Sequence, residues 1–356
     1  AGLAVSSCLT RIGVPHVVFE RERTVAAAWR RHYDRLHLHT SRGFSSLPHH
    51  SMPPRYPRYP SRDQVVNYLE ADVRAGSIDP KTGVNVRGVE REGPCWLVDT
   101  TDETIRCRSV VVATGAKGVP RPPEWPGLRT FPGSAVHSSD YRNGMPYSDQ
   151  DVLVVRFENS GGEIALDLLE HGARPMVSVR SPVNLIPRDI LGTPVLAIAI
   201  PLSKLPARLA DILIWPLLRA YYPSYSRLGL RRAAQGPFRQ IEETGRIPLL
   251  DVGTIREIRR GRIQVASDVR EISGSEVRFV KQKPRRFDAI VFATGYRPCV
   301  PPGLPQPPRG SHTGGRAGLY FCGFHVSPTG MLREIGIEAR RIAADIAKAM
   351  KRDGSA

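Results

Sequence analysis

Short apolar runs alternate along this chain with longer segments whose apolar residues recur at helical spacing. The runs lack the alternation of a half-exposed strand, which is typical of strands buried on both faces of a parallel sheet; they lie at residues 14–20, 110–113, 151–155, 176–179 and 287–293. The helical segments lie at residues 2–9, 61–73, 161–171 and 331–350. Because buried strands alternate with helices, the pattern predicts an α/β fold built from doubly wound parallel sheets.

Two features indicate that the chain repeats this plan. Apolar and polar residues alternate between residues 84 and 98, which predicts a β-meander leading into the buried run at 110–113. The sequence Ala-Thr-Gly follows that run and recurs after the run at 287–293, and a second strand-helix-strand unit begins near residue 150. Two such units predict two Rossmann-like, dinucleotide-binding domains.

The composition is strongly basic. Lys and Arg number 51 against 34 Asp and Glu, which gives a net charge of +17, and only seven of the 51 are lysine, which leaves 44 arginines. Arginine forks suit phosphate groups, so a polyanion or a dinucleotide is one interpretation of this excess. The arginines are scattered and form no stripe interleaved with aromatic residues, which favours a solvated, Arg-rich surface. The charge alone therefore predicts no nucleic-acid partner.

The cysteines exclude several kinds of chemistry. They are widely spaced and include no C-x-x-C pair, so we expect no disulfide framework, no zinc site and no dithiol chemistry of the disulfide-reductase kind. A reducing, cytoplasmic location is the simplest interpretation. The five are Cys8, Cys95, Cys107, Cys299 and Cys322.

The most apolar stretch, residues 194–222, is too charged to be a transmembrane segment. It is interrupted by Lys204, Arg208, Asp211 and Arg219. We interpret it as a buried or amphipathic helical region, and contact with a membrane surface is the less favoured alternative.

A first candidate phosphate turn lies at the start of the chain. Such a turn needs glycines where the backbone approaches pyrophosphate, a helix N-terminus, and an acid about 20 residues later. Gly2 and Glu20 fit the last glycine and the acid, although a helix and strand without a ligand fit equally well. The chain begins Ala-Gly-Leu-Ala and its first methionine is Met52. We therefore expect that its beginning was processed away or that it is an incomplete copy of a longer protein.

Residues 131–141 carry the most specific motif, F-x-G-x-x-x-H-x-x-x-Y, with Phe131, Gly133, His137 and Tyr141 at its fixed positions. Here the chain resembles the flavin-containing monooxygenases, in particular the plant YUCCA-type branch that makes auxin from indole-3-pyruvate. The related Baeyer–Villiger enzymes end this pattern with Trp. The resemblance covers essentially the whole chain, through residues 17–21, 29, 33–39, 59–61, 177–182, 186–192, 292–296 and 318–324.

The resemblance implies an FAD-binding domain with an NADPH-binding domain inserted into it. The first part of the FAD domain would occupy residues 1–147, the NADPH domain 148–284, and the second part of the FAD domain 285–356. NADPH would reduce FAD, the reduced flavin would capture O2 as a flavin hydroperoxide, and one oxygen atom would pass to a small-molecule substrate. No catalytic side chain and no metal site is required, and the sequence contains no Ser-His-Asp or metal-ligand cluster.

The resemblance also implies which residues bind the cofactors. Glu20 would hold the adenosine ribose of FAD, with Arg21 and Trp29 nearby, and the remaining FAD contacts would come from Gly2, Ala113, Thr114, Gly115 and Gly323. Arg180, nineteen residues after Gly161 at a strand end, is placed to pair with the 2′-phosphate of NADPH; a surface arginine at a strand end is the alternative. The NADPH turn itself would consist of Arg156, Glu158, Asn159, Ser160 and Gly161.

Two departures from the family pattern bear on activity. Only the last glycine of G-x-G-x-x-G remains in the second turn, where Arg156 adds bulk and Glu158 adds a negative charge next to the pyrophosphate. Arg156 itself offers a phosphate ligand, whereas Glu158 offers no compensation, so NADPH binding is predicted to be weakened by a few kcal/mol. The second departure is the absence of the first, central strand, which predicts poor FAD binding or poor folding.

The leading hypothesis is an FAD- and NADPH-dependent monooxygenase acting on indole-3-pyruvate or a similar 2-oxo acid. The alternatives are a monooxygenase of soft nitrogen or sulfur centres and a degenerate, catalytically impaired flavoprotein homologue. The expected partners are O2 and a small-molecule substrate, with no nucleic acid and no transmembrane segment. The sequence leaves the exact substrate and the oligomeric state open.

Overall fold

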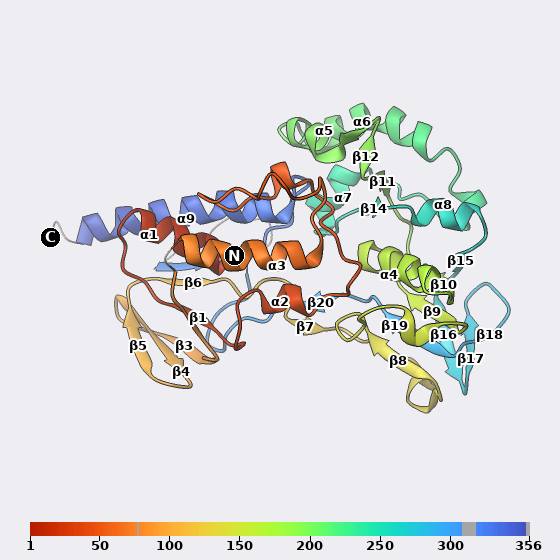
Figure 1. The fold of residues 1–356 in the computed structure, drawn as a ribbon, viewed down its shortest axis with the longest axis horizontal. Helices are drawn as coiled ribbons and strands as arrows, with labels where there is room; N and C mark the ends of the chain where they lie inside the picture. The colour runs from red at the N-terminus through yellow and green to blue at the C-terminus, as the bar shows by residue number, and fades with distance from the viewer. Residues whose placement is uncertain (77, 308–317, 354–356) are drawn as a thin grey trace. The chain divides into compact units, whose positions relative to one another are not determined.

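A computed structural model describes residues 1–76, 78–307 and 318–353. The chain forms two compact units (Figure 1). Unit 1 contains residues 1–30, 40–119 and 297–356, and unit 2 contains residues 31–39 and 120–296. The chain leaves unit 1 within β7 (Val119–Pro120) and returns within β20 (Tyr296–Arg297).

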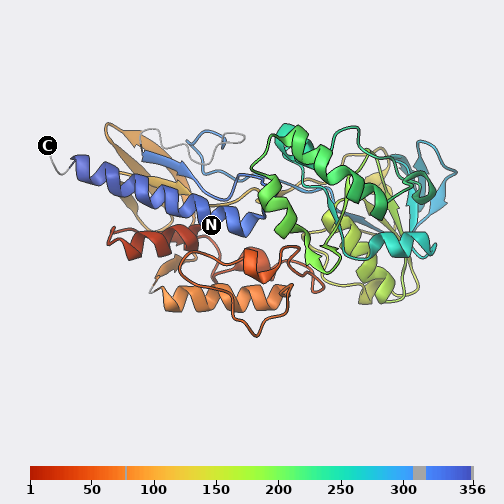
Figure 2. The same cartoon turned by 90° about the horizontal axis from the view of Figure 1, so that it is seen from above.

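Unit 1 joins parallel strand pairs to a β-meander and to helices. Its helices are α1 (Gly2–Arg11), α2 (Ala27–Arg30), α3 (Arg62–Ala75) and α9 (Met331–Asp353). Its other strands are β1 (Val18–Glu20), β2 (Pro80–Thr82), β3 (Val86–Glu92), β4 (Cys95–Thr100), β5 (Thr104–Cys107), β6 (Val110–Val112) and β21 (Leu319–Phe321). Strands β1 and β2 pair in parallel, as do β6 and β21, and β3, β4 and β5 form the antiparallel meander that the alternation predicts. Helices α1 and α9 lie side by side in both views (Figures 1 and 2).

Local signals explain where two of these elements begin. Helix α3 starts in a capping box, because Ser61 Oγ accepts the Gln64 N–H at 3.3 Å while Gln64 Oε1 accepts the Ser61 N–H at 2.9 Å. Strand β1 is shorter than the predicted 14–20, since Pro15 has no N–H for a ladder and the His16 ring donates to the Val14 carbonyl oxygen. The run at 14–20 therefore pairs only over its last three residues.

Unit 2 is built on a five-stranded parallel sheet in the order β15-β10-β9-β19-β8. These strands are β8 (Ser134–His137), β9 (Asp151–Val155), β10 (Arg174–Ser178), β15 (Gln264–Ala266) and β19 (Ala289–Phe292). The smaller strands are β11 (Leu185–Pro187), β12 (Asp189–Ile190), β13 (Thr193–Pro194), β14 (Leu249–Asp251), β16 (Val269–Ser273), β17 (Glu276–Phe279) and β18 (Arg285–Arg286). The helices are α4 (Asn159–Glu170), α5 (Val195–Leu202), α6 (Ala207–Tyr221), α7 (Pro237–Thr244) and α8 (Thr254–Arg259).

The central sheet is buried on both faces, as its continuous apolar strands predict. Val152 and Val154 of β9 belong to one hydrophobic core, which α4 and α8 cover. Leu153 and Val155 point the other way, into a second core covered by the antiparallel strands β16 and β17. Successive residues of a strand face opposite sides, so one short run fills both cores. Only one face of this sheet is thus covered by helices.

The predicted boundaries at 147/148 and 284/285 differ from this division. Strand β8 precedes residue 148 and β19 follows residue 284, yet both belong to the sheet of unit 2, where Ala289 pairs with Val152 on one side and Ser134 on the other. The assignment of FAD to residues 1–147 and 285–356 and of NADPH to residues 148–284 stays a prediction.

Candidate functional site

The turn between β9 and α4 keeps the shape of a phosphate-binding turn. A Cβ added to Gly161 would lie 2.1 Å from the Arg156 carbonyl oxygen, so no larger residue fits there. Arg156 has φ +79°, in the left-handed region that favours glycine. Glu158 is extended and forms the N-cap of α4, and its side chain does not cap the helix. The backbone N–H groups in the first turn of α4 therefore face this turn, as they do at the N-terminus of any helix.

The two unusual side chains of the turn interact with each other. Arg156 Nη2 lies 2.8 Å from Glu158 Oε1, and Arg156 Nη1 donates to the Thr294 carbonyl oxygen at 3.0 Å. Thr294 belongs to the second Ala-Thr-Gly sequence, so the guanidinium connects the two turns at the carboxyl ends of β9 and β19. The side chains are 27% and 42% exposed, respectively, which leaves the ion pair open to solvent and salt. The charge of Glu158 is therefore partly neutralised by Arg156.

Asn159 and Ser160 have structural partners. Asn159 Nδ2 donates to the Pro248 carbonyl oxygen at 3.3 Å, and Asn159 Oδ1 accepts the Leu250 N–H at 2.7 Å, which ties the start of α4 to β14. The Ser160 side chain lies beside the hydroxyl of Tyr33, whose pKa is raised chiefly by burial. These two residues thus present their backbone, and not their side chains, to any ligand of the turn.

The 131–141 motif supports the same end of the sheet. A Cβ on Gly133 would lie 2.0 Å from the Asp288 carbonyl oxygen. His137 Nε2 donates to the Gly295 carbonyl oxygen at 3.1 Å while its Nδ1 accepts the Ser139 N–H, and burial lowers the pKa of His137. The ring is therefore a neutral imidazole with both nitrogens used, and it fixes the turn after β19.

Tyr141, the last fixed residue of the motif, contacts helix α4. Its hydroxyl donates to Asp167 Oδ2 at 2.5 Å, and both side chains are buried. Burial raises the pKa of Asp167, and the Tyr141 hydrogen bond opposes that rise. The motif thus contacts the turn after β19 and helix α4 through packing and hydrogen bonds.

Residues 31–39 bind the same helix, which the sequence did not indicate. Arg35 makes two 2.8 Å contacts with the Glu170 carboxylate, and these contacts lower the pKa of Glu170. His39 pairs with Glu163, which is only 3% exposed. Glu163, Asp167 and Glu170 follow a helical spacing. Two of these acids, Glu163 and Asp167, lie among the apolar residues of a core-facing helix, and this was the available signal.

Arg180 lies directly after β10 and is exposed. Its carbonyl oxygen accepts a hydrogen bond from Arg231 Nη2 at 3.0 Å. Two guanidinium-bearing residues thus lie together at the carboxyl end of β10. Arg231 is a candidate phosphate ligand that the sequence pattern did not reveal, because it comes from a loop fifty residues away.

In unit 1 the structure brings three of the predicted FAD residues, Gly2, Ala113 and Gly323, to the start of α1. A Cβ on Gly2 would lie 3.7 Å from Ala113 Cβ, at the end of β6, and one on Gly323 would lie 3.0 Å from Ala1 Cβ. Gly323 has φ +84° and donates its N–H to Glu338 Oε2 at 2.7 Å. Glu20 ends β1, which lies against the same helix.

The other predicted FAD residues have different surroundings. Glu20 Oε1 accepts the Glu22 N–H at 2.9 Å, and the exposed Arg21 pairs with Glu22 at 3.4 Å, away from the Glu20 carboxylate. Trp29 lies in α2 and is partly buried. Thr114 Oγ1 donates to the Cys299 carbonyl oxygen at 2.5 Å, and Gly115 has φ +76°. Glu338, a buried carboxylate whose pKa burial raises, was not predicted.

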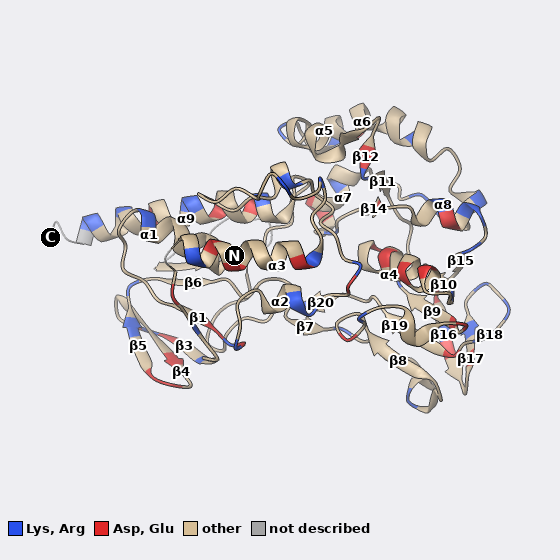
Figure 3. Ribbon diagram, in the orientation of Figure 1, with Lys and Arg blue, Asp and Glu red and all other residues tan. Residues whose placement is uncertain are grey.

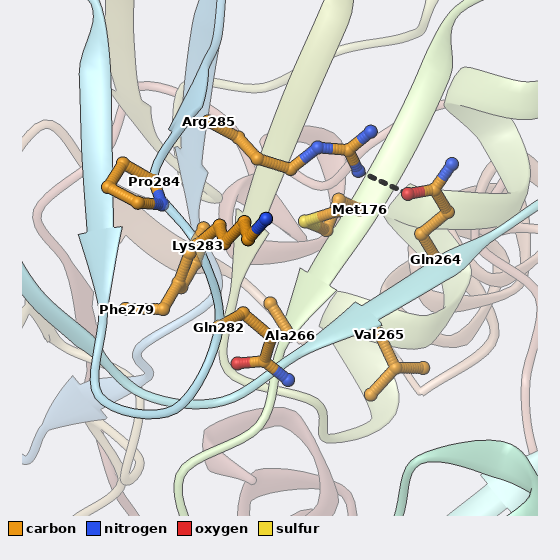
Figure 4. Close-up of a pocket in the computed structure, with 9 residues that line it drawn as sticks. All are labelled: Met176, Gln264, Val265, Ala266, Phe279, Gln282, Lys283, Pro284 and Arg285. Carbon is orange, nitrogen blue, oxygen red and sulfur yellow. Dashed lines mark hydrogen bonds between the residues drawn. The ribbon is translucent and has the colours of Figure 1, made fainter.

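A cavity of about 350 Å³ in unit 2 contains none of the predicted cofactor residues (Figure 4). Met176, Phe279, Lys283 and Arg285 are among the residues that line it, and Arg285 contacts Gln264. Among the described residues no group of three or more His, Cys, Asp or Glu side chains is arranged to hold a metal ion. The five cysteines are unpaired.

Comparison with known proteins agrees with this geometry. The family described as "Pyridine nucleotide-disulphide oxidoreductase" matches residues 1–187. A flavin-containing monooxygenase from Stenotrophomonas maltophilia superposes with a TM-score of 0.70 at 21% identity, covering 96% of this chain and 94% of that one. Cyclohexanone monooxygenase superposes with a TM-score of 0.75 at 18% identity, covering 99% and 87%. The fold is that of the two-domain, Rossmann-like flavin monooxygenases, as predicted.

Curated relatives identify the branch. "Indole-3-pyruvate monooxygenase YUCCA1" from Oryza sativa subsp. japonica is 39% identical, and the match covers 91% of this chain and 84% of the relative. "Probable indole-3-pyruvate monooxygenase YUCCA1" from Arabidopsis thaliana is 38% identical, with 91% and 82% covered. The chain belongs to the YUCCA family of flavin-dependent monooxygenases, which confirms the resemblance. Enzymes of this family use FAD and NADPH.

Proposed function

We propose that this protein oxygenates indole-3-pyruvate or a closely related 2-oxo acid, with FAD in unit 1 and NADPH in unit 2. The names of its relatives support the substrate class. The main observation in favour of NADPH in unit 2 is the geometry of the turn before α4. A Cβ at position 161 would clash with the Arg156 carbonyl oxygen, and the Arg156 guanidinium lies beside the start of the helix.

The residues of unit 1 fit a flavin dinucleotide. Gly2, Ala113 and Gly323 surround the start of α1 without bulky side chains, so a pyrophosphate could approach the helix N-terminus. Glu20 supplies a carboxylate at the end of the adjacent strand, where it would accept hydrogen bonds from ribose hydroxyls. Bound FAD would supply the redox chemistry with O2, and these residues would hold its adenosine end.

The residues of unit 2 fit NADPH with one conflict. The N-terminus of α4, Arg156 and the exposed Arg180 offer donors and positive charge for phosphate groups. Glu158 competes with the pyrophosphate for the Arg156 guanidinium, so the chain would hold NADPH less tightly than an all-glycine turn. This ion pair is the observation that favours the second candidate, a catalytically impaired homologue.

Product analysis with the purified, flavin-loaded protein tests the proposal. We expect oxidation of NADPH that depends on indole-3-pyruvate, with decarboxylated indole-3-acetate formed in proportion. Formation of N- or S-oxides from amine or sulfide substrates, without turnover of 2-oxo acids, would contradict the substrate assignment. A normal flavin spectrum with no substrate-dependent NADPH oxidation would identify the impaired homologue instead.

A further inference from the structure

Exposed hydrophobic side chains gather on one part of unit 2. Thirteen large hydrophobic residues are exposed in the described parts of the chain, and six of them lie between residues 191 and 215. This segment includes β13, α5 and most of α6, and the two helices lie close together in Figure 1. The six, which we call the α6 face, are Leu191, Leu205, Leu209, Ile212, Leu213 and Trp215.

Helix α6 is apolar on two sides. Ala210, Ile214 and Leu218 recur every four residues and are buried in a small core with Phe238 of α7. Ile212 and Leu213 lie on the other side and are 66% and 60% exposed. Exposed side chains of this size in one cluster mark an interaction surface.

The exposed charges of α6 itself and of the turn before it are positive. Lys204, Arg208 and Arg219 are exposed, and the Arg219 guanidinium lies 5.3 Å from the centre of the Trp215 ring. The one acid of α6, Asp211, turns inward and accepts the backbone N–H groups of Phe238 and Arg239 at the start of α7. Residues 195–221 thus present three cations and no exposed carboxylate to solvent.

We propose that the α6 face binds the surface of an anionic lipid bilayer, with the helix lying in the plane of the interface. Leucine and isoleucine side chains would enter the acyl boundary, Trp215 would lie at the headgroup level, and the three cations would contact acidic headgroups. This binding is independent of the proposed oxygenation.

Charge complementarity selects the bilayer over a second copy of the chain. Each copy carries a net charge of +17, and a symmetric contact through the α6 face would bring the same cations of both copies together. An anionic bilayer attracts that charge instead, by roughly fivefold in affinity for each cation near the surface. No helix of the described ranges is long and apolar enough to cross a membrane, so the contact would be peripheral.

Vesicle sedimentation with the full, flavin-loaded chain tests the proposal. We expect binding to phosphatidylcholine vesicles that contain phosphatidylserine, much weaker binding to pure phosphatidylcholine, and release by salt. The double variant Ile212→Gln/Leu213→Gln should lower the partition coefficient by about tenfold or more. The matched control is Met145→Gln/Val280→Gln, since both side chains are equally exposed elsewhere in unit 2; it should bind like the unaltered chain.

Two further measurements complete the test. Arg208→Gln/Arg219→Gln should remove the preference for phosphatidylserine, and binding should shift Trp fluorescence to the blue in the unaltered chain but far less in Trp215→Phe. Equal binding by the α6-face variant and its control, or no binding to acidic vesicles, would overturn the proposal. A dimer in solution that the Ile212→Gln/Leu213→Gln variant abolishes would assign the face to a second copy and overturn it as well.

Discussion

Arg156 and Glu158 show how single residues change a site without changing its shape. The backbone of Arg156 takes the glycine-like conformation that the turn requires, and Gly161 remains at the point of closest approach. The sequence predicted a loss of a few kcal/mol in NADPH binding from these two residues. In the structure the two side chains pair with each other and are partly exposed. The pair offsets part of the carboxylate charge and also occupies the guanidinium, so the loss stays a prediction.

Replacement of Glu158 by Gln tests this directly. The variant frees the Arg156 guanidinium and removes a negative charge beside the pyrophosphate, so the Kd for NADPH should fall by about three- to tenfold. Glu276→Gln is the matched control, because Glu276 is 43% exposed and also pairs with an arginine, Arg278. Calorimetric titration gives both constants. An unchanged Kd for Glu158→Gln would mean that Glu158 does not oppose the nucleotide.

At the scale of elements, α4 is held by hydrogen bonds to its buried acids. Asp167 lies on the core side of the helix, and burial raises its pKa. Tyr141 is its donor, from a motif twenty-six residues earlier. The strength with which α4 is fixed to the sheet therefore depends on a pairing between distant segments.

Tyr141→Phe should lower the free energy of unfolding by about 1–3 kcal/mol, because it removes one hydrogen-bond donor from a buried carboxylate. Loss of the donor raises the folded-state pKa of Asp167 further, so the variant binds protons more readily when folded. The difference in unfolding free energy between the variant and the unaltered chain should accordingly be largest near neutral pH, and it should shrink as the pH falls through that pKa. Urea unfolding at about pH 7 and about pH 5 measures both values.

The control for this prediction is Tyr147→Phe. Tyr147 is buried and stacks on Tyr141 with ring centres 5.8 Å apart, yet its hydroxyl has no hydrogen-bond partner among the described residues. Its replacement should change stability by less than about 0.5 kcal/mol. A pH-independent deficit for Tyr141→Phe would show that lost packing, and not the Asp167 carboxylate, causes the effect.

Local pattern was enough to predict most elements but not their partners. The capping box at Ser61, the buried strands and the glycine-limited turn at Gly161 depend on neighbouring residues, and the structure contains all three. The attachment of residues 31–39 to α4 and the membership of β8 and β19 in the central sheet depend on pairings across more than 100 residues. The spacing of apolar residues within one segment gives no information about such pairings.

At the scale of the whole molecule, the positive charge is spread over helices and loops of both units (Figure 3). Many arginines are paired with acids, as Arg174 is with Asp151 at 2.9 Å. Around Glu257, three arginines share one carboxylate: Arg256, Arg260 and Arg262. The net charge of +17 therefore acts as a diffuse field. The cations proposed as ligands of phosphate or lipid headgroups are the few near the turn before α4 and near the α6 face.

The division into two units predicts that each cofactor stabilises its own part of the chain. Hydrogen exchange of the full protein, followed by mass spectrometry, can separate the two effects. FAD should slow exchange in α1, β1 and the segment around Gly323, whereas NADPH should slow exchange in β9, the turn at 156–161 and the start of α4. At about one hundred times Kd, each ligand should raise the protection of its unit by up to about 2.7 kcal/mol. The Glu158→Gln variant, compared at one fixed NADPH concentration, should show greater protection in unit 2 and no change in the response to FAD. Protection of unit 1 by NADPH in flavin-free protein, with no effect at 156–161, would reverse the assignment of the cofactors to the units.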